Sequence, residues 1–325
     1  MKAIRLHEFG PAENLRYEDV PDPVPTAGMV LLDVEAAGVH LVDTMIRTGP
    51  VPDSPFPVPE LPTIPGREVA GRVSAVGPDV DEAWIGKRVV VHLGMVPGGY
   101  AERAVAKVES LYELPGHVDA ADAVAAIGTG RTTAGILREA NLTADDVVIV
   151  TSAAGGIGSY AIQSARNVGA VAIGLAGGPA KVEIVRSLGA QYAVDYRDPD
   201  WVQVLKGELG DREPTLLLDG VGGENGQRAF ELLGHGGRAL LFGASGGGPI
   251  QFTQDDLIAR GLSVSWTLGA KMARQLRSLE REAVDETVAG RWKALTTPFP
   301  LAAAAAAHQA LETRAATGKV VLIPG

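Results

Sequence analysis

The sequence predicts an α/β protein with two domains: a β-rich first domain and a second domain built on a doubly wound parallel sheet. Up to about residue 118, short apolar runs are bounded by Pro, Gly and other turn residues, which is typical of a partly closed β domain. From about Asp119, apolar runs alternate with helical patterns, as βαβ units require. A glycine-rich turn joins one of these runs to a helix, which is the third observation.

The expected elements follow in chain order. In the first domain, Val30–Ala36 and Arg88–Leu93 are strand candidates. In the second domain, six apolar runs are expected to form the parallel sheet; they cover residues 147–150, 171–175, 192–194, 216–218, 239–242 and 262–266. A helical stretch is expected over 270–292, and the strand-like tail Lys319–Pro324 is expected to rejoin the first domain. The predicted boundaries are 1–118 and 290–325 for the first domain and 119–289 for the second.

Prolines recur between Pro50 and Pro65. A segment with so few backbone donors resists regular structure, so we expect a stiff surface loop. Such a loop can be a lid or specificity element, or it can serve only as a spacer.

Composition excludes several classes of function. The chain has 325 residues, 46% of them hydrophobic, which suffices for two folded domains. A formal net charge of -10 argues against nucleic acid or an anionic membrane as a partner. There is no cysteine, so disulfides, thiol nucleophiles and thiolate metal sites are impossible. The first residues lack a signal-peptide core, and the apolar run Leu301–Ala307 is too short to span a bilayer, so we expect a cytoplasmic protein.

The turn Thr151–Gly158 is the most informative motif. It follows the apolar run Val147–Val150 and opens a helical pattern, and its key positions Ala153, Gly155 and Gly158 are all small. Backbone N–H groups at a helix N-terminus bind phosphate, and small residues let the backbone approach a pyrophosphate. We therefore expect the stretch from Ala153 through Gly155, Gly156 and Ile157 to Gly158 to bind a dinucleotide; the alternative is an ordinary strand-to-helix turn.

The residues after the next strand indicate which dinucleotide. An NAD site usually carries a carboxylate there for the ribose 2′-hydroxyl, but this chain has Ala176, Gly177 and Gly178, and its next charge is Lys181. A lysine would pair with a 2′-phosphate, which a carboxylate would repel. The sequence thus favours NADPH over NADH, unless Lys181 is only a solvated residue of a first helical turn.

The order of motifs resembles the medium-chain dehydrogenase/reductase superfamily, and within it the zinc-free quinone oxidoreductase (zeta-crystallin-like) branch. The resemblance covers nearly the whole chain and is carried by the segments 38–43, 46–49, 64–71, 76–77, 86–90, 98–102, 153–158, 188–190, 195–197, 219–222, 236–238 and 318–322.

The resemblance implies a fold and a set of cofactor contacts. It implies a GroES-like catalytic domain, formed by the N-terminal part and the C-terminal tail, and a Rossmann NADPH-binding domain. Lys181 and Tyr196 match the pair that holds the 2′-phosphate in NADPH-dependent members, and Asp43 matches a residue near the cofactor ribose. Arg314 matches a tail arginine that approaches the cofactor. The segment at the nicotinamide ribose is matched by Phe242, Gly243, Ala244 and Ser245. Many relatives are homodimers paired through the last strand of the Rossmann sheet, here Leu262–Trp266.

The sequence departs from the family pattern at its metal and acceptor positions. Zinc relatives carry Cys and His where this chain has His40 and Arg67, and a guanidinium has no lone pair for a metal. A site of His40, Asp43 and Glu68 is conceivable, but Arg67 would place a positive charge beside the ion, so we expect no metal. The tyrosines of the quinone-reductase pattern are replaced by Met45 and Val51.

Two classes of function remain open at this stage. The first is an NADPH-dependent reductase of a small apolar electrophile, either a quinone or an activated carbon–carbon double bond such as an enone or 2-alkenal. The second is a non-catalytic NADPH-binding protein with a structural or sensory role. In the first class His40 is the candidate proton donor, because imidazole titrates near neutral pH, and Asp43 could orient its ring. A histidine that only fills the family's Asn position is the alternative.

Overall fold

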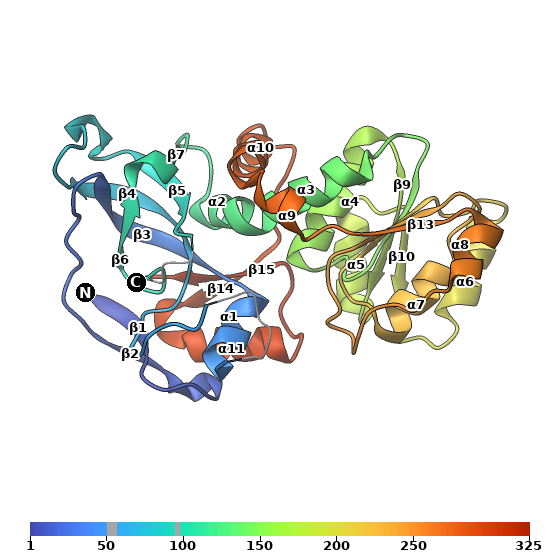
Figure 1. Ribbon diagram of the computed structural model, residues 1–325, viewed down its shortest axis with the longest axis horizontal. Coiled ribbons are helices and arrows are strands. Elements are labelled where there is room, and N and C mark those ends of the chain that lie inside the picture. Colours follow the sequence, from blue (N-terminus) through green and yellow to red (C-terminus); the bar gives the residue numbers. More distant parts are fainter. Residues whose placement is uncertain (51–56, 95–97) are drawn as a thin grey trace. The chain divides into compact units, whose positions relative to one another are not determined.

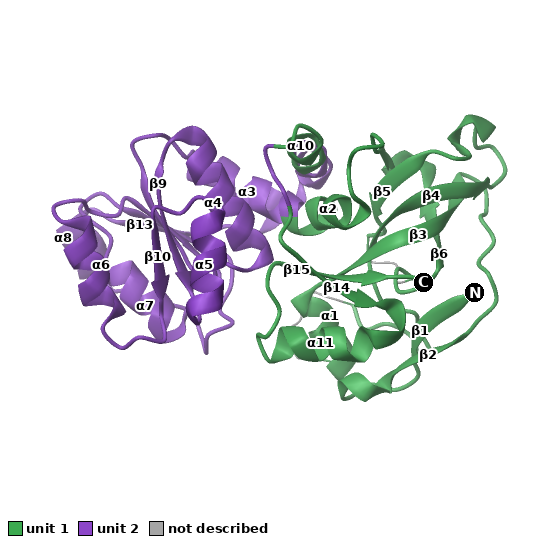
Figure 2. Cartoon of the chain, turned by 180° about the vertical axis from the view of Figure 1, so that it is seen from behind, with its two compact units in different colours: residues 1–129, 283–290, 294–325 green, residues 130–282, 291–293 purple. Residues whose placement is uncertain are grey.

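The computed structural model describes residues 1–50, 57–94 and 98–325, and the chain forms two compact units (Figures 1 and 2). The first unit comprises Met1–Thr129, Ala283–Gly290 and Ala294–Gly325, and the second comprises Gly130–Glu282 and Arg291–Lys293. The first unit extends beyond residue 118. The reason is that α2 (Ala120–Ala125) buries its apolar face against strands of that unit, through Ala123 and Val124. Part of the Pro50–Pro65 segment, with Val51, lies outside the described residues.

The first unit is built on a mostly antiparallel sheet of seven strands in the order β14-β15-β3-β4-β5-β7, with β6 also paired to β3. These strands are β3 (Met29–Val39), β4 (Glu68–Val76), β5 (Arg88–His92), β6 (Arg103–Lys107), β7 (Tyr112–Glu113), β14 (Thr296–Pro300) and β15 (Lys319–Ile323). The C-terminal strand β15 runs antiparallel to β3, so the tail rejoins the first unit as expected. A hairpin of β1 (Lys2–Leu6) and β2 (Leu15–Asp19) and the helices α1 (Leu41–Thr48) and α11 (Ala304–Glu312) complete the unit.

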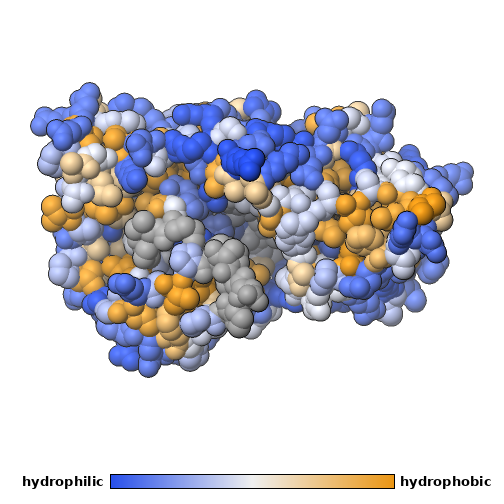
Figure 3. Space-filling model, viewed as in Figure 1, coloured by the Kyte–Doolittle hydropathy of each residue, from blue (hydrophilic) through white to orange (hydrophobic). Residues whose placement is uncertain are grey.

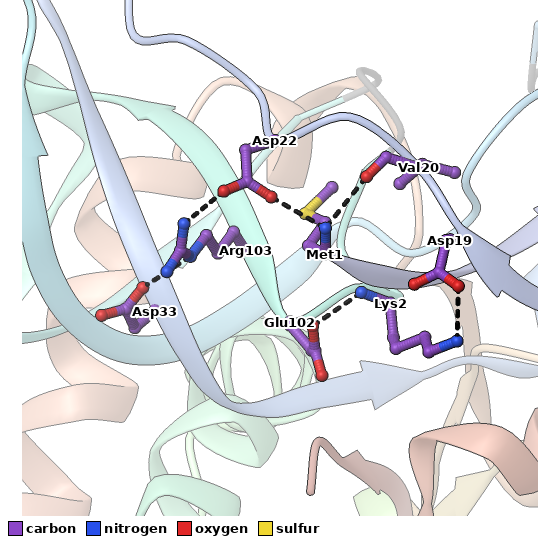
Figure 4. Close-up of polar contacts among 8 residues, drawn as sticks. All are labelled: Met1, Lys2, Asp19, Val20, Asp22, Asp33, Glu102 and Arg103. Atoms are coloured by element: carbon purple, nitrogen blue, oxygen red, sulfur yellow. Dashed lines mark hydrogen bonds and ion pairs between the residues drawn. The ribbon is translucent and has the colours of Figure 1, made fainter.

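The N-terminal strand is held by polar contacts at the surface (Figure 4). The Met1 ammonium donates to Asp22 Oδ1 at 2.8 Å, and Asp22 also pairs with Arg103. The backbone N–H of Lys2 donates to Glu102 Oε2 at 2.6 Å. Ion pairs as exposed as that of Asp22 and Arg103 contribute little to the stability of the fold.

The second unit is a six-stranded parallel sheet with the order β10-β9-β8-β11-β12-β13. Its strands are β8 (Val147–Val150), β9 (Val171–Ala176), β10 (Tyr192–Asp195), β11 (Leu216–Asp219), β12 (Arg238–Leu241) and β13 (Ser263–Trp266). These bounds agree with the six predicted strands to within one residue. The helices are α3 (Arg131–Ala140), α4 (Gly156–Val168), α5 (Pro179–Ser187), α6 (Trp201–Leu209), α7 (Gly223–Glu231), α8 (Gln254–Arg260) and α9 (Ala270–Ala273).

Two cores cover the two faces of this parallel sheet. Alternate residues of a strand point to opposite faces, so Val148 and Val150 join one core while Val147 and Ile149 join the other. Helices α3, α4 and α5 pack on the first face, and α6 and α7 pack on the second (Figure 1). A strand buried on both faces must be apolar throughout, which is why β8 reads Val-Val-Ile-Val.

The expected helix over 270–292 is divided into α9 and α10 (Leu276–Val288). Helix α10 passes from the second unit into the first, where Val284 joins the core beside α2. None of the helices in the described part of the chain is long and apolar enough to cross a membrane.

A buried polar chain joins α11 to α1 in the first unit. Tyr100 donates its hydroxyl hydrogen to Asp43 Oδ2 at 3.2 Å, and its oxygen lies 3.2 Å from His308 Nε2. Burial lowers the pKa of His308 to about 4; the positive charge of Arg47 acts in the same direction and Asp43 opposes it. Burial and the Asp43 charge raise the pKa of the Tyr100 phenol, so it stays protonated and can donate.

We expect His308 to make the stability of the protein depend on pH. The folded state holds His308 neutral, whereas the unfolded chain binds a proton below about pH 6.5. Its contribution to the free energy of unfolding is therefore fully present above about pH 6.5 and falls by about 3 kcal/mol as the pH is lowered to about 4. Urea denaturation of the wild type and His308→Gln at several pH values measures this difference. Parallel pH profiles for the two proteins would contradict the assignment.

Candidate functional site

The first part of the site is a buried carboxylate. The residues that surround it come from three neighbouring strands of the first unit. Glu68 begins β4 and is fully buried, and Lys319 begins β15 two strands away, with its Nζ atom 2.5 Å from Glu68 Oε1. Strands two apart in a sheet are separated by roughly 10 Å, so these two side chains meet across the middle strand β3. The residue between them is Gly38; a Cβ atom there would lie 1.9 Å from Glu68 Oε1. The pair therefore depends on a glycine at position 38.

The second oxygen of Glu68 faces His40. His40 Nε2 lies 2.7 Å from Glu68 Oε2, and the His40 side chain is 21% exposed. A Cβ atom on Gly128, in the π-helical turn Ala126–Gly130, would lie 1.8 Å from the same oxygen and 2.8 Å from His40 Nε2. Burial by itself would raise the pKa of the Glu68 carboxyl, but the interactions with His40 and Lys319 outweigh this and hold that pKa well below its ordinary value.

His40 is also the residue at which α1 begins. Its backbone N–H donates to Asp43 Oδ2 at 2.8 Å, which closes the first turn of the helix. The Asp43 carboxylate thus contacts the backbone of His40, and Glu68 contacts the ring. Asp43 is itself buried, and its Oδ1 atom lies 3.5 Å from Arg67 Nε.

A small cavity of about 50 Å³ lies beside Asp43 in the first unit. It is lined by Leu6, Asp43, Ile46, Arg47, Pro57, Pro59, Thr63, Pro65, Gly66 and Arg67. Most of these residues present apolar atoms, so the cavity suits a small apolar group more than a charged one.

The glycine turn of the second unit follows β8, as predicted. Ser152 has φ +50°, and Gly155 is the N-cap of α4, which begins at Gly156 and includes Ile157. A Cβ atom at Gly158 would lie 2.3 Å from Ser152 O and 2.7 Å from Ala153 Cα, so only glycine permits this close packing of helix on turn. The first N–H groups of α4 thus stand at the carboxyl end of the strand, where a phosphate group can bind.

Basic side chains gather at the carboxyl ends of β9 and β10. A Cβ atom on Gly177 would lie 2.5 Å from Tyr196 Oη and 3.2 Å from Arg197 Nε, so both side chains cover that glycine. Lys181 lies in the first turn of α5, and burial together with the neighbouring positive charge of Arg197 lowers its pKa. Asp195 Oδ1 accepts the backbone N–H groups of Gly178 and Arg197, at 2.9 and 3.0 Å. Two cations held this close favour an anion between them.

Glycines also shape the loops after β11 and β12. Buried Asp219 ends β11 and accepts hydrogen bonds from Thr151 Oγ1 at 2.7 Å and from the backbone of Gly222 at 3.0 Å. The segment Phe242–Ser245 follows β12, and a Cβ atom on Gly243 would lie 2.3 Å from the oxygen of Gly220. The two loops therefore pack backbone against backbone.

The structure brings some predicted site residues together and leaves others apart. In the second unit, the predicted site residues all follow the carboxyl ends of strands of one sheet: 153–158 after β8, Gly177 and Lys181 after β9, Tyr196 after β10 and 242–245 after β12. In the first unit, His40 and Asp43 share the start of α1, whereas exposed Arg314 follows α11. Arg314 and Asp43 belong to the first unit, so their approach to a cofactor stays a prediction.

Sequence reasoning named Glu68 beside His40 only as a conceivable metal ligand, and it missed Lys319 and Arg197 as partners in the site. Glu68 and Lys319 stand in the motifs 64–71 and 318–322, but 250 residues of chain lie between these two residues, and only the strand order joins them. Arg197 directly follows Tyr196, and this adjacency was the one available signal.

Comparisons with known proteins agree with this architecture. A family model described as an alcohol dehydrogenase GroES-like domain matches residues 26–116, and one described as a zinc-binding dehydrogenase matches residues 156–289. A quinone oxidoreductase from Sus scrofa is 33% identical over 329 residues, which cover 99% of this chain and 98% of the relative. A 2-haloacrylate reductase from a Burkholderia species is 29% identical, with 99% and 98% covered. The crystal structure of Escherichia coli quinone oxidoreductase complexed with NADPH matches with a TM-score of 0.84 at 28% identity, over all of both chains.

One family description names zinc, but the residues of this chain do not fit a zinc ion. Glu68 and His40 face each other, and the other Glu68 oxygen faces the Lys319 ammonium, so neither carboxylate oxygen is directed at an open position. Arg67 and Lys319 both place positive charge beside the place where a zinc ion would bind, and the chain has no cysteine. Among the described residues, no group of three His, Asp or Glu side chains could hold a metal ion.

Gly38→Ala should destabilise the first unit, because the added methyl group overlaps the Glu68 carboxylate. Overpacking of this kind costs roughly 1–3 kcal/mol. Gly116→Ala is the matched control, since a Cβ atom there meets nothing within 4 Å. Urea denaturation of both variants measures the effect, and equal stability of the two would show that the Glu68–Lys319 pair can move aside without cost.

Proposed function

Because the chain belongs to the medium-chain dehydrogenase/reductase superfamily, in its quinone oxidoreductase branch, we propose that it is an NADPH-dependent, zinc-independent reductase. Its acceptor is a quinone or an activated carbon–carbon double bond, as in an enone or 2-alkenal. The observation that carries the choice of cofactor is the interaction of two like charges, Lys181 and Arg197, with Arg197 and Tyr196 both against Gly177. NADPH, when bound, supplies the hydride, and the acceptor takes up that hydride and one proton.

The residues of the second unit bind and orient the cofactor in this proposal. The N–H groups at the start of α4 and the small residues Ala153, Gly155 and Gly158 accommodate the pyrophosphate. Lys181, Tyr196 and Arg197 hold the 2′-phosphate through charge-assisted hydrogen bonds. Phe242–Ser245 passes the nicotinamide ribose, as in relatives.

His40 acts on the substrate in this proposal. Its side chain is partly exposed, whereas Glu68, which contacts its ring, is fully buried. An enone needs a proton at the α carbon and polarisation of its carbonyl group, which an imidazole can supply near neutral pH. A reduced quinone can take its protons from solvent, so it depends less on His40.

We further propose that the protein is a homodimer paired through β13. This strand is at the edge of the six-stranded sheet, and Trp266 on it is 55% exposed. Ile258 and Leu268 are exposed nearby in the sequence, and Figure 3 shows apolar side chains gathered over the part of the second unit where α8 and β13 lie. Unpaired strand edges with apolar side chains favour association. Sedimentation should give twice 33.7 kDa for the wild type and 33.7 kDa for Trp266→Arg; a monomeric wild type would refute the proposal.

Lys181→Ala should weaken the preference for NADPH over NADH. A charge-assisted hydrogen bond contributes about 1.5–3 kcal/mol, so the KM for NADPH should rise roughly ten- to a hundredfold while that for NADH changes little. Arg197→Ala should act in the same direction. Lys206→Ala, which removes an exposed charge elsewhere in the second unit, is the control. Equal use of NADH and NADPH by the wild type would contradict the proposed cofactor.

His40→Ala should reduce turnover of an enone at least about a hundredfold, since general acid catalysis contributes roughly 10²–10⁴-fold. NADPH affinity should stay within a few-fold, and quinone reduction should fall much less. NADPH oxidation is followed with quinones, 2-alkenals, cyclic enones and enoyl thioesters, with the exposed His235→Ala as the control. Tight NADPH binding without turnover of any acceptor by the wild type would instead favour a non-catalytic NADPH-binding protein.

A further inference from the structure

Glu68 contacts the His40 ring from inside the first unit. Its Nε2 atom lies 2.7 Å from Glu68 Oε2, and Glu68 is fully buried, whereas 21% of the His40 side chain remains exposed. One edge of the ring thus faces the protein interior, and another part of the ring is accessible. An arrangement in which a buried carboxylate holds an accessible imidazole is one way in which proteins fix the tautomer of a histidine.

The carboxylate is present as a charged group because the surrounding chain compensates it. An isolated buried carboxylate would be too costly to ionise, and the Lys319 ammonium, 2.5 Å away, supplies the opposite charge. Burial would raise the pKa of the Glu68 carboxyl, but His40 and Lys319 hold it well below its ordinary value. An ionised carboxylate only accepts hydrogen bonds, so the nitrogen that faces it must carry the hydrogen.

Two glycines border this contact. A Cβ atom on Gly128 would approach both Glu68 Oε2 and His40 Nε2, at 1.8 and 2.8 Å, and one on Gly38 would approach Glu68 Oε1 at 1.9 Å. A side chain at either position would overlap the carboxylate, so the contact depends on glycine at both.

We propose that Glu68, charge-compensated by Lys319, is the positioning residue of His40: it keeps one ring proton on Nε2 and fixes the plane of the ring, so that the proton given to the substrate leaves from Nδ1 of the doubly protonated ring. Its importance for turnover rests on the proposed function, because His40 is the group that meets the substrate there. Glu68 touches neither substrate nor cofactor in this scheme and acts only through His40.

The test replaces Glu68 and Lys319 together, so that no unpaired buried charge remains. Glu68→Leu combined with Lys319→Met, the apolar double variant, keeps the volume and removes both charges, a change that buried ion pairs often tolerate. Glu68→Gln combined with Lys319→Met, the amide double variant, keeps an acceptor for Nε2–H without the charge, and serves if the first variant fails to fold. Arg131→Met combined with Glu280→Leu removes a different ion pair, at 3.1 Å, and is the control.

The first readout is the ring ¹⁵N spectrum of His40, assigned by its loss in His40→Ala. The neutral wild-type ring should be protonated on Nε2. The apolar double variant should shift the ring toward a mixture of tautomers, the amide double variant should lie between the two, and the control should match the wild type. A wild-type ring protonated on Nδ1, or a spectrum that the substitutions leave unchanged, would overturn the proposal.

The second readout separates positioning from a general loss of structure. Enone turnover of the apolar double variant should fall at least about tenfold, part of the range of general acid catalysis, with NADPH affinity within about twofold. Turnover that stays within twofold of the wild type would also overturn the proposal. If the wild type reduces no acceptor, the proposed function fails, and the ¹⁵N spectrum still decides whether Glu68 sets the tautomer of His40.

Discussion

A carboxylate buried without access to water is the constraint on which the first unit depends. Glu68 can remain ionised there because the Lys319 ammonium lies at one of its oxygens and the His40 ring lies at the other. Each partner comes from a different element: β15 supplies Lys319, and the start of α1 supplies His40. The pairing of the C-terminal tail with β3 places Lys319 at Glu68, which links the last strand of the chain to the geometry of its candidate site.

The candidate site of the second unit differs in its charge, because in the proposed function it binds an anion. Parallel strands place all their carboxyl ends at one edge of the sheet, so short loops from β8, β9, β10, β11 and β12 collect there. Glycines let these loops approach each other closely, as where Gly243 packs against Gly220. Lys181 and Arg197 then place two positive charges side by side, an arrangement that an incoming phosphate stabilises.

The two units thus use charge in opposite ways. In the first unit the charges are paired internally, so they fix the position of one imidazole ring. In the second unit like charges are gathered at the end of the sheet, so they favour a ligand of opposite sign. The absence of the family's metal ligands is consistent with this division, since Arg67 and Lys319 bring positive charge to the place where a zinc ion would need uncommitted donors.

The sequence alone determined the class of fold, the six parallel strands, the glycine turn after β8 and the basic residue after β9. These features are local. Each pattern, whether apolar runs alternating with helical patterns or small residues at a strand-to-helix turn, lies within a few tens of residues of the sequence. Only the tertiary structure decided that Glu68, rather than Asp43, contacts the His40 ring, and that Lys319 compensates its charge. The order β15-β3-β4 brings these distant residues together across Gly38, and no local pattern encodes a contact between side chains with 250 residues of chain between them.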